Sequence, residues 1–351
     1  MTGTILIYGA SGYTGKLIAE RAAGLGERPI LAGRDRARVE AVARPLGLEA
    51  RAFGLDDRQA LDAGLRGVSA ALSAAGPFSA TSRPMVEACL RNRVHYLDIT
   101  GEIDVFEAVA ARDADARAAG VTLLPGVGFD VVPSDCLAAH LKRRLPDATR
   151  LTLWLSLGAN LSRGTAKTMV EGIAAGTRTR RGGVLVRSDR AETGSCDFGA
   201  GERPTLQVSW GDVSTAFHST GIPDIEVHFE AMPQLQAMAR APSFVKSFLG
   251  LPFMQAFLKR RIDRMPEGPS AEARRSGRTI LVGEASDARG GRVRTRLTAP
   301  EGYAFTAVAA LDAARRVAAG EVAPGFQTPS RAFGPDYVLS FEGVTRQDLN
   351  R

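Results

Sequence analysis

The chain of 351 residues is longer than most single hydrophobic cores, so we expect two domains. Its net charge of +7, carried by forty arginines and five lysines, favours anionic ligands, but no helix-turn-helix, RNA-binding or zinc-finger pattern points to nucleic acid. The three cysteines lie far apart, the four histidines lack metal-ligand spacing, and no apolar run has transmembrane length. We therefore expect a cytoplasmic protein without disulfides or a metal.

The first element is a short apolar strand at 4–8, followed by a glycine-rich turn and an amphipathic helix. The turn has the spacing GxxGxxG. Glycines at such positions permit a tight turn and a close approach to a pyrophosphate, whose charge is stabilised by the N–H groups of the helix start. The sequence therefore predicts a dinucleotide site here. Its expected contact residues are Gly9, Ser11, Gly12, Tyr13, Thr14 and Gly15.

The end of the second strand, at 28–33, indicates which dinucleotide binds. In an NAD site this position presents an acidic side chain to the ribose, whereas here it presents Gly33 and Arg34. Glycine leaves room for a 2'-phosphate, and arginine binds phosphate in a fork geometry, with Arg38 as a second cation one helical turn later. These residues favour NADP(H). Asp35 is either the N-cap of the next helix or, in the alternative NAD site, the ribose-binding acid.

Short apolar runs alternate with amphipathic stretches up to about residue 145, which predicts an α/β domain with a Rossmann-type, doubly wound parallel sheet at 1–145. The further strands are expected at 49–53, 68–73, 94–99 and 121–125, and the helices at 36–44, 56–65, 82–92 and 104–119. Ligands of such a sheet bind at the carboxyl ends of the strands. The cofactor contacts expected there are Ala75, Gly76, Pro77, Phe78, Thr100 and Gly101.

Residues 146–351 are expected to form an α+β domain with a largely antiparallel sheet, which serves as substrate platform and homodimer surface. Its strands are expected at 151–157, 205–210, 225–231, 278–286 and 291–299, with a helix at 165–175. An alanine-rich helix at 303–319 should pack back on the first domain. The segment 244–258 contains four phenylalanines beside basic residues, so it is either a lid, an acyl tunnel or a lipid contact, or else a pair of core helices.

Several of these motifs resemble the saccharopine dehydrogenase-like oxidoreductases, and in particular the branch named for trans-acting enoyl reductases. The resemblance is carried by residues 9–15, 32–34, 75–78, 96–102, 128–135 and 325–334. It implies a Rossmann domain that binds NADP(H), and hydride transfer to or from a C=C, C=N or C=O bond.

We find no set of groups for the carboxylates of an amino-acid substrate, and 244–258 is apolar. We therefore expect reduction of an enoyl bond in a hydrophobic acyl, polyketide or lipid-like substrate. The alternative is a saccharopine-type C=N or C=O reductase or dehydrogenase acting on an amino-acid-derived substrate. A second alternative is a non-catalytic cofactor-binding scaffold at a lipid surface.

Three residues are candidates for catalysis. Hydride transfer leaves a carbanion-like or alkoxide-like product, so the site needs a proton donor and a group that stabilises negative charge. Glu102 and Asp130 follow strand ends and would orient substrate or relay a proton; the alternative is that they cap loops. Lys167 would polarise a carbonyl, and its alternative is an ordinary solvated lysine.

Overall fold

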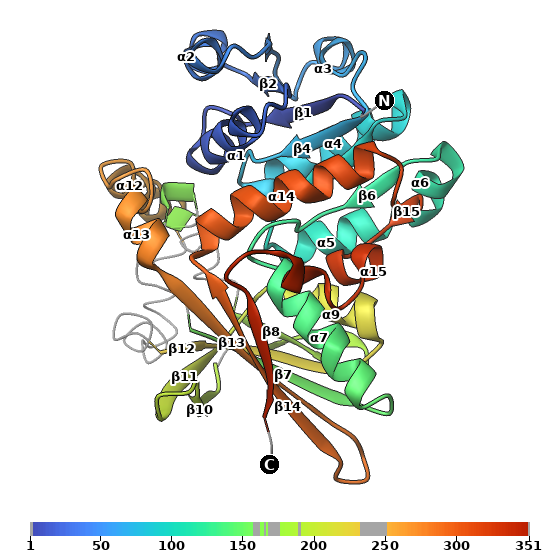
Figure 1. Ribbon diagram of the computed structural model, residues 1–351, viewed down its shortest axis with the longest axis vertical. Helices are drawn as coiled ribbons and strands as arrows, with labels where there is room; N and C mark the ends of the chain where they lie inside the picture. The colour runs from blue at the N-terminus through green and yellow to red at the C-terminus, as the bar shows by residue number, and fades with distance from the viewer. Residues whose placement is uncertain are drawn as a thin grey trace. The chain divides into compact units, whose positions relative to one another are not determined.

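The computed structural model describes residues 3–156, 162–164, 166–167, 176–188, 191–231 and 251–349. The chain forms two compact units, residues 1–132 with 302–337, and residues 133–301 with 338–351 (Figure 1). The division therefore differs from the one expected at residue 145. The physical reason is that helix α7 (Val132–Arg144) packs its Leu137 and Leu141 side chains against Gly283 of the second unit.

The first unit contains a parallel sheet, as predicted. The strand order β15-β6-β5-β4-β1-β2-β3 reverses between β1 and β4, which is the position where doubly wound sheets bind ligands. The strands are β1 (Ile5–Tyr8), β2 (Ile30–Gly33), β3 (Ala50–Ala52), β4 (Ala70–Ser73), β5 (His95–Asp98), β6 (Thr122–Leu124) and β15 (Gly325–Phe326). Strand β15 has only two residues, so it left no pattern in the sequence from which it could be predicted.

Helices connect and cover these strands. They are α1 (Tyr13–Gly24), α2 (Arg36–Leu46), α3 (Arg58–Gly64), α4 (Phe78–Asn92), α5 (Ile103–Ala110), α6 (Asp113–Ala119), α14 (Gly302–Ala318) and α15 (Pro329–Phe333). The helix expected at 104–119 is in fact two helices, because Asp113 and Asp115 lie in the first turn of α6 and stabilise a new helix start. The alanines of α14 share a buried core with α1 and the sheet, which α14 crosses in Figure 1.

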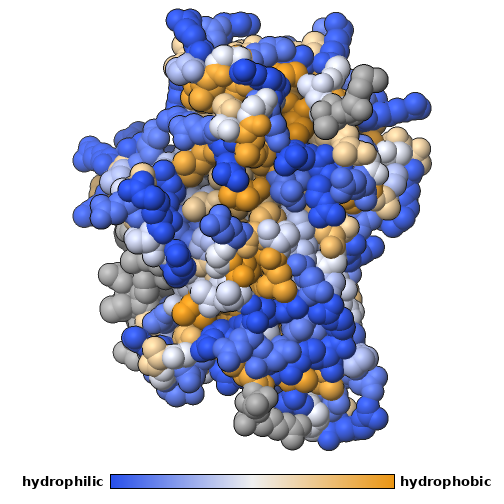
Figure 2. All heavy atoms as spheres, viewed as in Figure 1, coloured by the Kyte–Doolittle hydropathy of each residue, from blue (hydrophilic) through white to orange (hydrophobic). Residues whose placement is uncertain are grey.

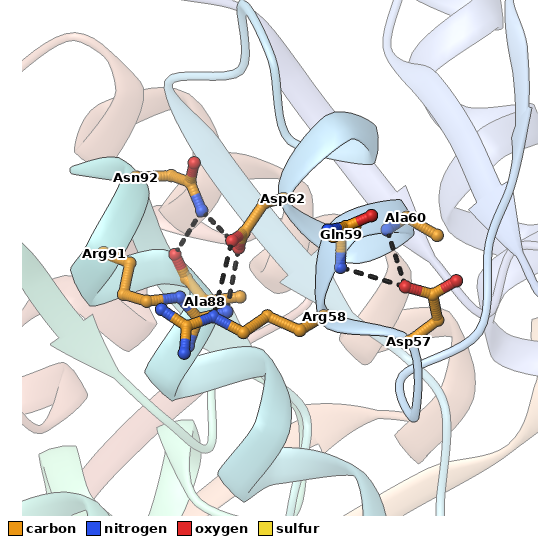
Figure 3. A network of polar contacts seen from close by, with 8 residues as sticks. All are labelled: Asp57, Arg58, Gln59, Ala60, Asp62, Ala88, Arg91 and Asn92. Carbon is orange, nitrogen blue, oxygen red and sulfur yellow. Dashed lines mark hydrogen bonds and ion pairs between the residues drawn. The ribbon is translucent and has the colours of Figure 1, made fainter.

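Polar side chains fix the helices that follow β3 and β4 (Figure 3). Asp57 caps α3 by accepting hydrogen bonds from the backbone N–H groups of Gln59 and Ala60, at 2.9 and 3.0 Å. Asp62 of α3 accepts from Arg91 at 2.8 Å and from Asn92 at 2.7 Å, both at the end of α4. This network ties α3 to α4, whose first turn lies at the carboxyl edge of the sheet.

Among its described residues, the second unit contains a sheet of nine strands, largely antiparallel as predicted; of the strand pairings described there, only that of β12 with β7 is parallel. The strands are β7 (Arg150–Ser156), β8 (Thr177–Arg181), β9 (Val184–Ser188), β10 (Thr193–Asp197), β11 (Glu202–Val208), β12 (Asp224–Glu230), β13 (Arg278–Ser286), β14 (Arg292–Pro300) and β16 (Thr345–Leu349). One face is apolar, with Leu153, Val227 and Leu281 fully buried. Helix α7 covers this face, and a hydrogen bond from the Ser219 hydroxyl to Asp135 joins it to α9 (Asp212–Thr220).

Two shorter helices, α12 (Pro252–Ile262) and α13 (Ala271–Ser276), complete the described part of the second unit. The residues expected to form a helix at 165–175, and 244–250 of the aromatic segment, fall almost entirely outside the described residues. None of the helices described has both the length and the apolar character needed to span a bilayer. Hydrophilic residues cover much of the surface visible in Figure 2, with apolar residues gathered in patches between them.

Candidate active site

The turn from β1 to α1 requires glycine at two of its three glycine positions. Gly9 has a φ of +82°, and a Cβ atom there would lie 2.8 Å from the Ala75 nitrogen. A Cβ atom on Gly15 would collide with the carbonyl oxygen of Gly9, so this glycine lets α1 pack directly on the turn. The Gly12 N–H closes the turn with a hydrogen bond of 2.9 Å to the Gly9 oxygen.

The start of α1 fits a pyrophosphate. Its N-cap is Gly12, which has no side chain and so provides no capping hydrogen bond, and its first turn contains no acidic residue. The positive end of the helix dipole is therefore not neutralised by the helix itself, and an anion can take that place. Ser11 and Thr14 are half-buried beside it. The Tyr13 ring packs edge-on against Tyr303 of α14, with centroids 5.2 Å apart, which fixes the first residue of the helix.

The tip of β2 has the features expected for a 2'-phosphate site. Arg34 and Arg38 are both exposed, and a Cβ atom on Gly33 would lie 3.0 Å from a methyl group of Val39. Asp35 accepts a hydrogen bond of 3.1 Å from the Arg38 N–H and so caps α2. Of the two roles considered for Asp35, the structure therefore shows the helix cap.

Glu102 is the residue before α5, and its carboxyl group lies against the start of helix α4. Its two carboxyl oxygens accept hydrogen bonds from the backbone N–H groups of Phe78 and Ser79, at 2.8 and 2.9 Å. The N-cap residue Pro77 has no side-chain group that could do this, so Glu102 supplies the cap from another loop. The contact joins the loop containing Ala75, Gly76 and Pro77 to the loop containing Thr100 and Gly101. The structure thus shows the capping role, and a catalytic role for Glu102 stays a prediction.

Asp98 organises the same edge of the sheet, and it was missed from the sequence because it looks like the last residue of a buried strand. The side chain is fully buried. Its Oδ1 accepts hydrogen bonds from the N–H groups of Thr100 and Gly126, at 3.0 and 2.9 Å, and its Oδ2 accepts from the Tyr96 hydroxyl at 2.6 Å. Burial raises the pKa of Asp98 to about 6, and these hydrogen bonds oppose that rise.

Asp130 lies against Gly101, where an added Cβ atom would be 3.2 Å from the Asp130 Oδ2 atom. The residue as a whole is half-buried, but its carboxyl group lies deep enough that burial raises its pKa to about 7. The loop that carries it is held by Thr306 of α14, whose hydroxyl accepts a hydrogen bond of 2.9 Å from the Phe129 N–H. The first unit therefore brings Gly101, Glu102 and Asp130 together.

Lys167 belongs to the second unit. Its Nζ atom forms an ion pair of 2.6 Å with Asp263, and both side chains are partly exposed. This contact is compatible with the alternative of an ordinary surface lysine, and a role in polarising a carbonyl stays a prediction.

Comparisons with known proteins bear on this site. Residues 5–124 match the family described as saccharopine dehydrogenase NADP binding domain. A trans-acting enoyl reductase of Mycobacterium leprae is 35% identical over 150 residues, which cover 40% of this chain and 36% of the relative. A trans-acting enoyl reductase of Mycobacterium bovis is 36% identical over 154 residues, with coverage of 40% and 35%. The matches thus span little more than a third of the length of these relatives.

A solved structure resembles the whole chain. The apo saccharopine dehydrogenase (L-Glu forming) from Saccharomyces cerevisiae aligns with a TM-score of 0.67 at 12% identity, and the alignment covers 99% of this chain and 100% of that one. At this identity the likeness establishes a common fold. The resemblance noted in the sequence and the preference for NADP(H) are confirmed by the family match. The chain has the fold of this saccharopine dehydrogenase, and residues 5–124 match the saccharopine dehydrogenase NADP binding domain.

Proposed function

We propose that this protein is an NADP(H)-dependent oxidoreductase that reduces the enoyl C=C bond of a hydrophobic acyl, polyketide or lipid-like substrate. The observation that carries the proposal is the glycine turn of β1 and α1 with Arg34 beside it, in a domain that matches the saccharopine dehydrogenase NADP binding family. The relatives named trans-acting enoyl reductase support the choice of an enoyl bond.

The first unit supplies the groups that would hold the cofactor. The amide end of α1 binds the pyrophosphate, Gly33 leaves space at the ribose, and Arg34 and Arg38 bind the 2'-phosphate. The loops at 75–78 and 100–101 would line the part of the site that holds the nicotinamide. When bound, NADPH provides the hydride that this chemistry needs.

Asp130 is the proposed proton donor. Reduction of an enoyl carbonyl compound adds a hydride at the carbon remote from the carbonyl and a proton at the carbon next to it. A carboxyl group with a pKa of about 7 is protonated in a large fraction of molecules at neutral pH and can give up that proton. The hydrogen bond from Phe129 to Thr306 positions the loop that presents it. Glu102 would act indirectly, by joining the two neighbouring loops, and Lys167 would polarise the carbonyl.

The test separates this proposal from its two alternatives. Titration of the protein into NADPH, followed by the fluorescence of the nicotinamide, measures cofactor binding. Turnover is then compared between a crotonyl thioester and an imine formed from an amino acid and a 2-oxo acid. Oxidation of NADPH by the thioester supports the enoyl reductase. Oxidation by the imine alone supports the saccharopine-type reaction, and binding without any oxidation supports a non-catalytic scaffold.

A lipid contact is proposed for helix α12, the described part of the aromatic segment. Phe253 and Phe257 lie four residues apart and are 61% and 58% exposed. Arg260 and Arg261 continue the same exposed stripe of the helix. Aromatic rings beside arginines suit the interface of an anionic bilayer. Homodimerisation is a separate prediction, and the molar mass measured by light scattering tests it.

A further inference from the structure

One face of the sheet in the second unit is polar, in contrast to the apolar face under α7. Side chains alternate between the faces of a strand, so Glu226, His228 and Glu230 of β12 point to the same side. The register places Gln207 of β11 opposite His228, and His228 opposite Trp154 of β7. We call the following residues the polar face: Thr205, Gln207, Glu226, His228, Glu230, Thr152, Trp154 and Ser156.

Three side chains of the polar face are buried without satisfying their hydrogen-bonding atoms. The exposed fractions of Thr205, Gln207 and His228 are 1%, 3% and 6%. Within the part of the chain that the structure describes, the Thr205 hydroxyl, the Gln207 Nε2 atom and both ring nitrogens of His228 have no hydrogen-bond partner. Buried polar groups are nearly always hydrogen-bonded in folded proteins, so a cluster of exceptions on adjacent strands calls for a functional explanation.

The charges around this cluster restrict the ligand that would satisfy it. The neighbouring His228 ring and the Arg181 guanidinium hold the pKa of Glu226 at about 2, so this carboxyl group is ionised at neutral pH. The His228 Nε2 atom lies 3.7 Å from Glu226, beyond hydrogen-bond distance. Glu230 accepts a hydrogen bond of 2.5 Å from Ser156. Each of these glutamates already pairs with an arginine, Glu226 with Arg181 at 2.7 Å and Glu230 with Arg203 at 4.0 Å. A ligand carboxylate or phosphate would have to compete with the glutamates for these arginines, whereas an uncharged oxygen would not.

The donors and the ring beside them fit an acyl group. Gln207 offers an amide N–H, and the His228 ring offers a ring N–H, so both can donate to one carbonyl oxygen. The Trp154 ring lies next to His228, with ring centroids 6.2 Å apart, and it provides an apolar surface for the adjoining carbon chain. Trp154 itself packs against a small buried cluster of Cys196, Phe198 and Val282.

We propose that the polar face recognises the uncharged carbonyl group of an acyl ligand, with Gln207 and His228 as donors and Trp154 beside the carbon chain. This inference rests on the proposed function for the identity of the acyl ligand, and it adds residues of the second unit to substrate recognition. It also favours an acyl thioester over a substrate with several carboxylates.

Trp154 provides the measurement. The chain has two tryptophans, and the other one, Trp210, packs on Phe229 of the apolar side with centroids 4.8 Å apart. The variant W210F therefore makes the fluorescence report on Trp154 alone. Titration of W210F with crotonyl-N-acetylcysteamine, in the absence of cofactor, should give a saturable change in emission. Free crotonate, which has the same carbon chain and a negative charge, should give none.

Variants in the W210F background test the two donors. Gln207→Leu and His228→Phe should each weaken binding of the thioester about tenfold, as expected for the loss of one hydrogen bond to a ligand. Unchanged affinity in both variants would overturn the proposal. So would equal binding of crotonate and the thioester, or no saturable response to either, even if the enzyme reduces enoyl thioesters. Saturable, donor-dependent binding without turnover would instead support the site and contradict the proposed reaction.

His140 provides a matched structural control. It is as buried as His228, but its ring nitrogens contact Asp348 at 2.9 Å and Arg143 at 3.0 Å. His140→Phe should lower the melting temperature because it breaks these contacts. His228→Phe should leave the melting temperature unchanged or raise it, because it removes unsatisfied buried atoms. A fall in the His228 variant as large as that in the His140 variant would show that His228 is structural and would contradict the proposal.

Discussion

The hydroxyl group of Tyr96 donates a hydrogen bond of 2.6 Å to Oδ2 of Asp98 inside the first unit. The other oxygen of that carboxyl group binds the backbone of Thr100 and Gly126. One buried side chain therefore holds the turns after β5 and β6 in place. Because Asp130 follows the second turn and lies against the first, Asp98 positions the proposed proton donor.

The charge of Asp98 should make stability depend on pH. Burial raises its pKa from the ordinary value of 3.8 to about 6, so the folded state binds the proton more tightly than the unfolded state does. The stabilisation from this proton is complete below the unfolded pKa and is lost as the pH rises through about 6. Over that range, the wild type should lose on the order of 2–3 kcal/mol of unfolding free energy relative to Asp98→Asn, which has no charge.

Urea unfolding of both proteins at several pH values between 4 and 7 measures this difference. Asp98→Ala is the complementary variant, because it removes the acceptor for two backbone N–H groups and, like Asp98→Asn, carries no charge; it should be about 3 kcal/mol less stable than Asp98→Asn at every pH. Parallel stability curves for the wild type and Asp98→Asn would show that Asp98 does not titrate in this range.

The pH dependence of turnover tests Asp130. A proton donor must be protonated to act, and the pKa of Asp130 is about 7. The rate should therefore be constant at low pH and fall about tenfold per pH unit above this value. Asp130→Asn should lower kcat by about 10²- to 10⁴-fold and abolish that descending limb. The control is Asp115→Asn, a change in an exposed acid of α6 that pairs with Arg112. It should leave kcat and the descending limb of the pH profile unchanged. A descending limb that persists in Asp130→Asn would assign the proton to another group.

Arg34 should distinguish the two nicotinamide cofactors. The guanidinium group can form charge-assisted hydrogen bonds only with the 2'-phosphate of NADPH, so Arg34→Ala should raise the Kd for NADPH by about 10- to 100-fold. The Kd for NADH should hardly change. Arg36→Ala is the control, since Arg36 is exposed and pairs with Glu40. Equal losses for NADPH and NADH would place the phosphate elsewhere.

Co-sedimentation with vesicles tests the lipid contact of α12. The wild type should bind vesicles that contain phosphatidylglycerol and not pure phosphatidylcholine, and salt should weaken the binding by screening its arginines. The double variant Phe253→Ala and Phe257→Ala should bind about tenfold less, because two aromatic anchors are lost. Val184→Ala changes another exposed apolar residue, 65% exposed on β9, and should bind like the wild type. Equal binding by the double variant and the wild type would exclude α12 as the contact.

The local pattern of the sequence was enough to predict the parallel sheet, the glycine turn and the largely antiparallel second sheet. These features depend on periodicity and on glycines at fixed spacing, and both can be read within a short window. The start of α7 was missed because Val132 follows a run of turn-forming residues, which resembled a loop after a strand.

The long-range contacts of the site could not be read in this way. Glu102 caps α4 from a position 24 residues away from Phe78, and Asp98 binds Gly126 across 28 residues. Lys167 pairs with Asp263, nearly a hundred residues further along the chain. Such pairs are fixed by the tertiary fold and leave no regular spacing in the sequence. The sequence therefore showed which residues could be functional, but not which residues they contact.

Transfer of deuterium from NADPH labelled at C4 tests the central claim most directly. The protein is incubated with crotonyl-N-acetylcysteamine and either the 4R- or the 4S-labelled cofactor, and the product is analysed by mass spectrometry and NMR. We predict that one label alone appears in the butyryl product, at the carbon remote from the carbonyl group. Binding of NADPH without transfer of either label to this or to longer enoyl thioesters would contradict the account.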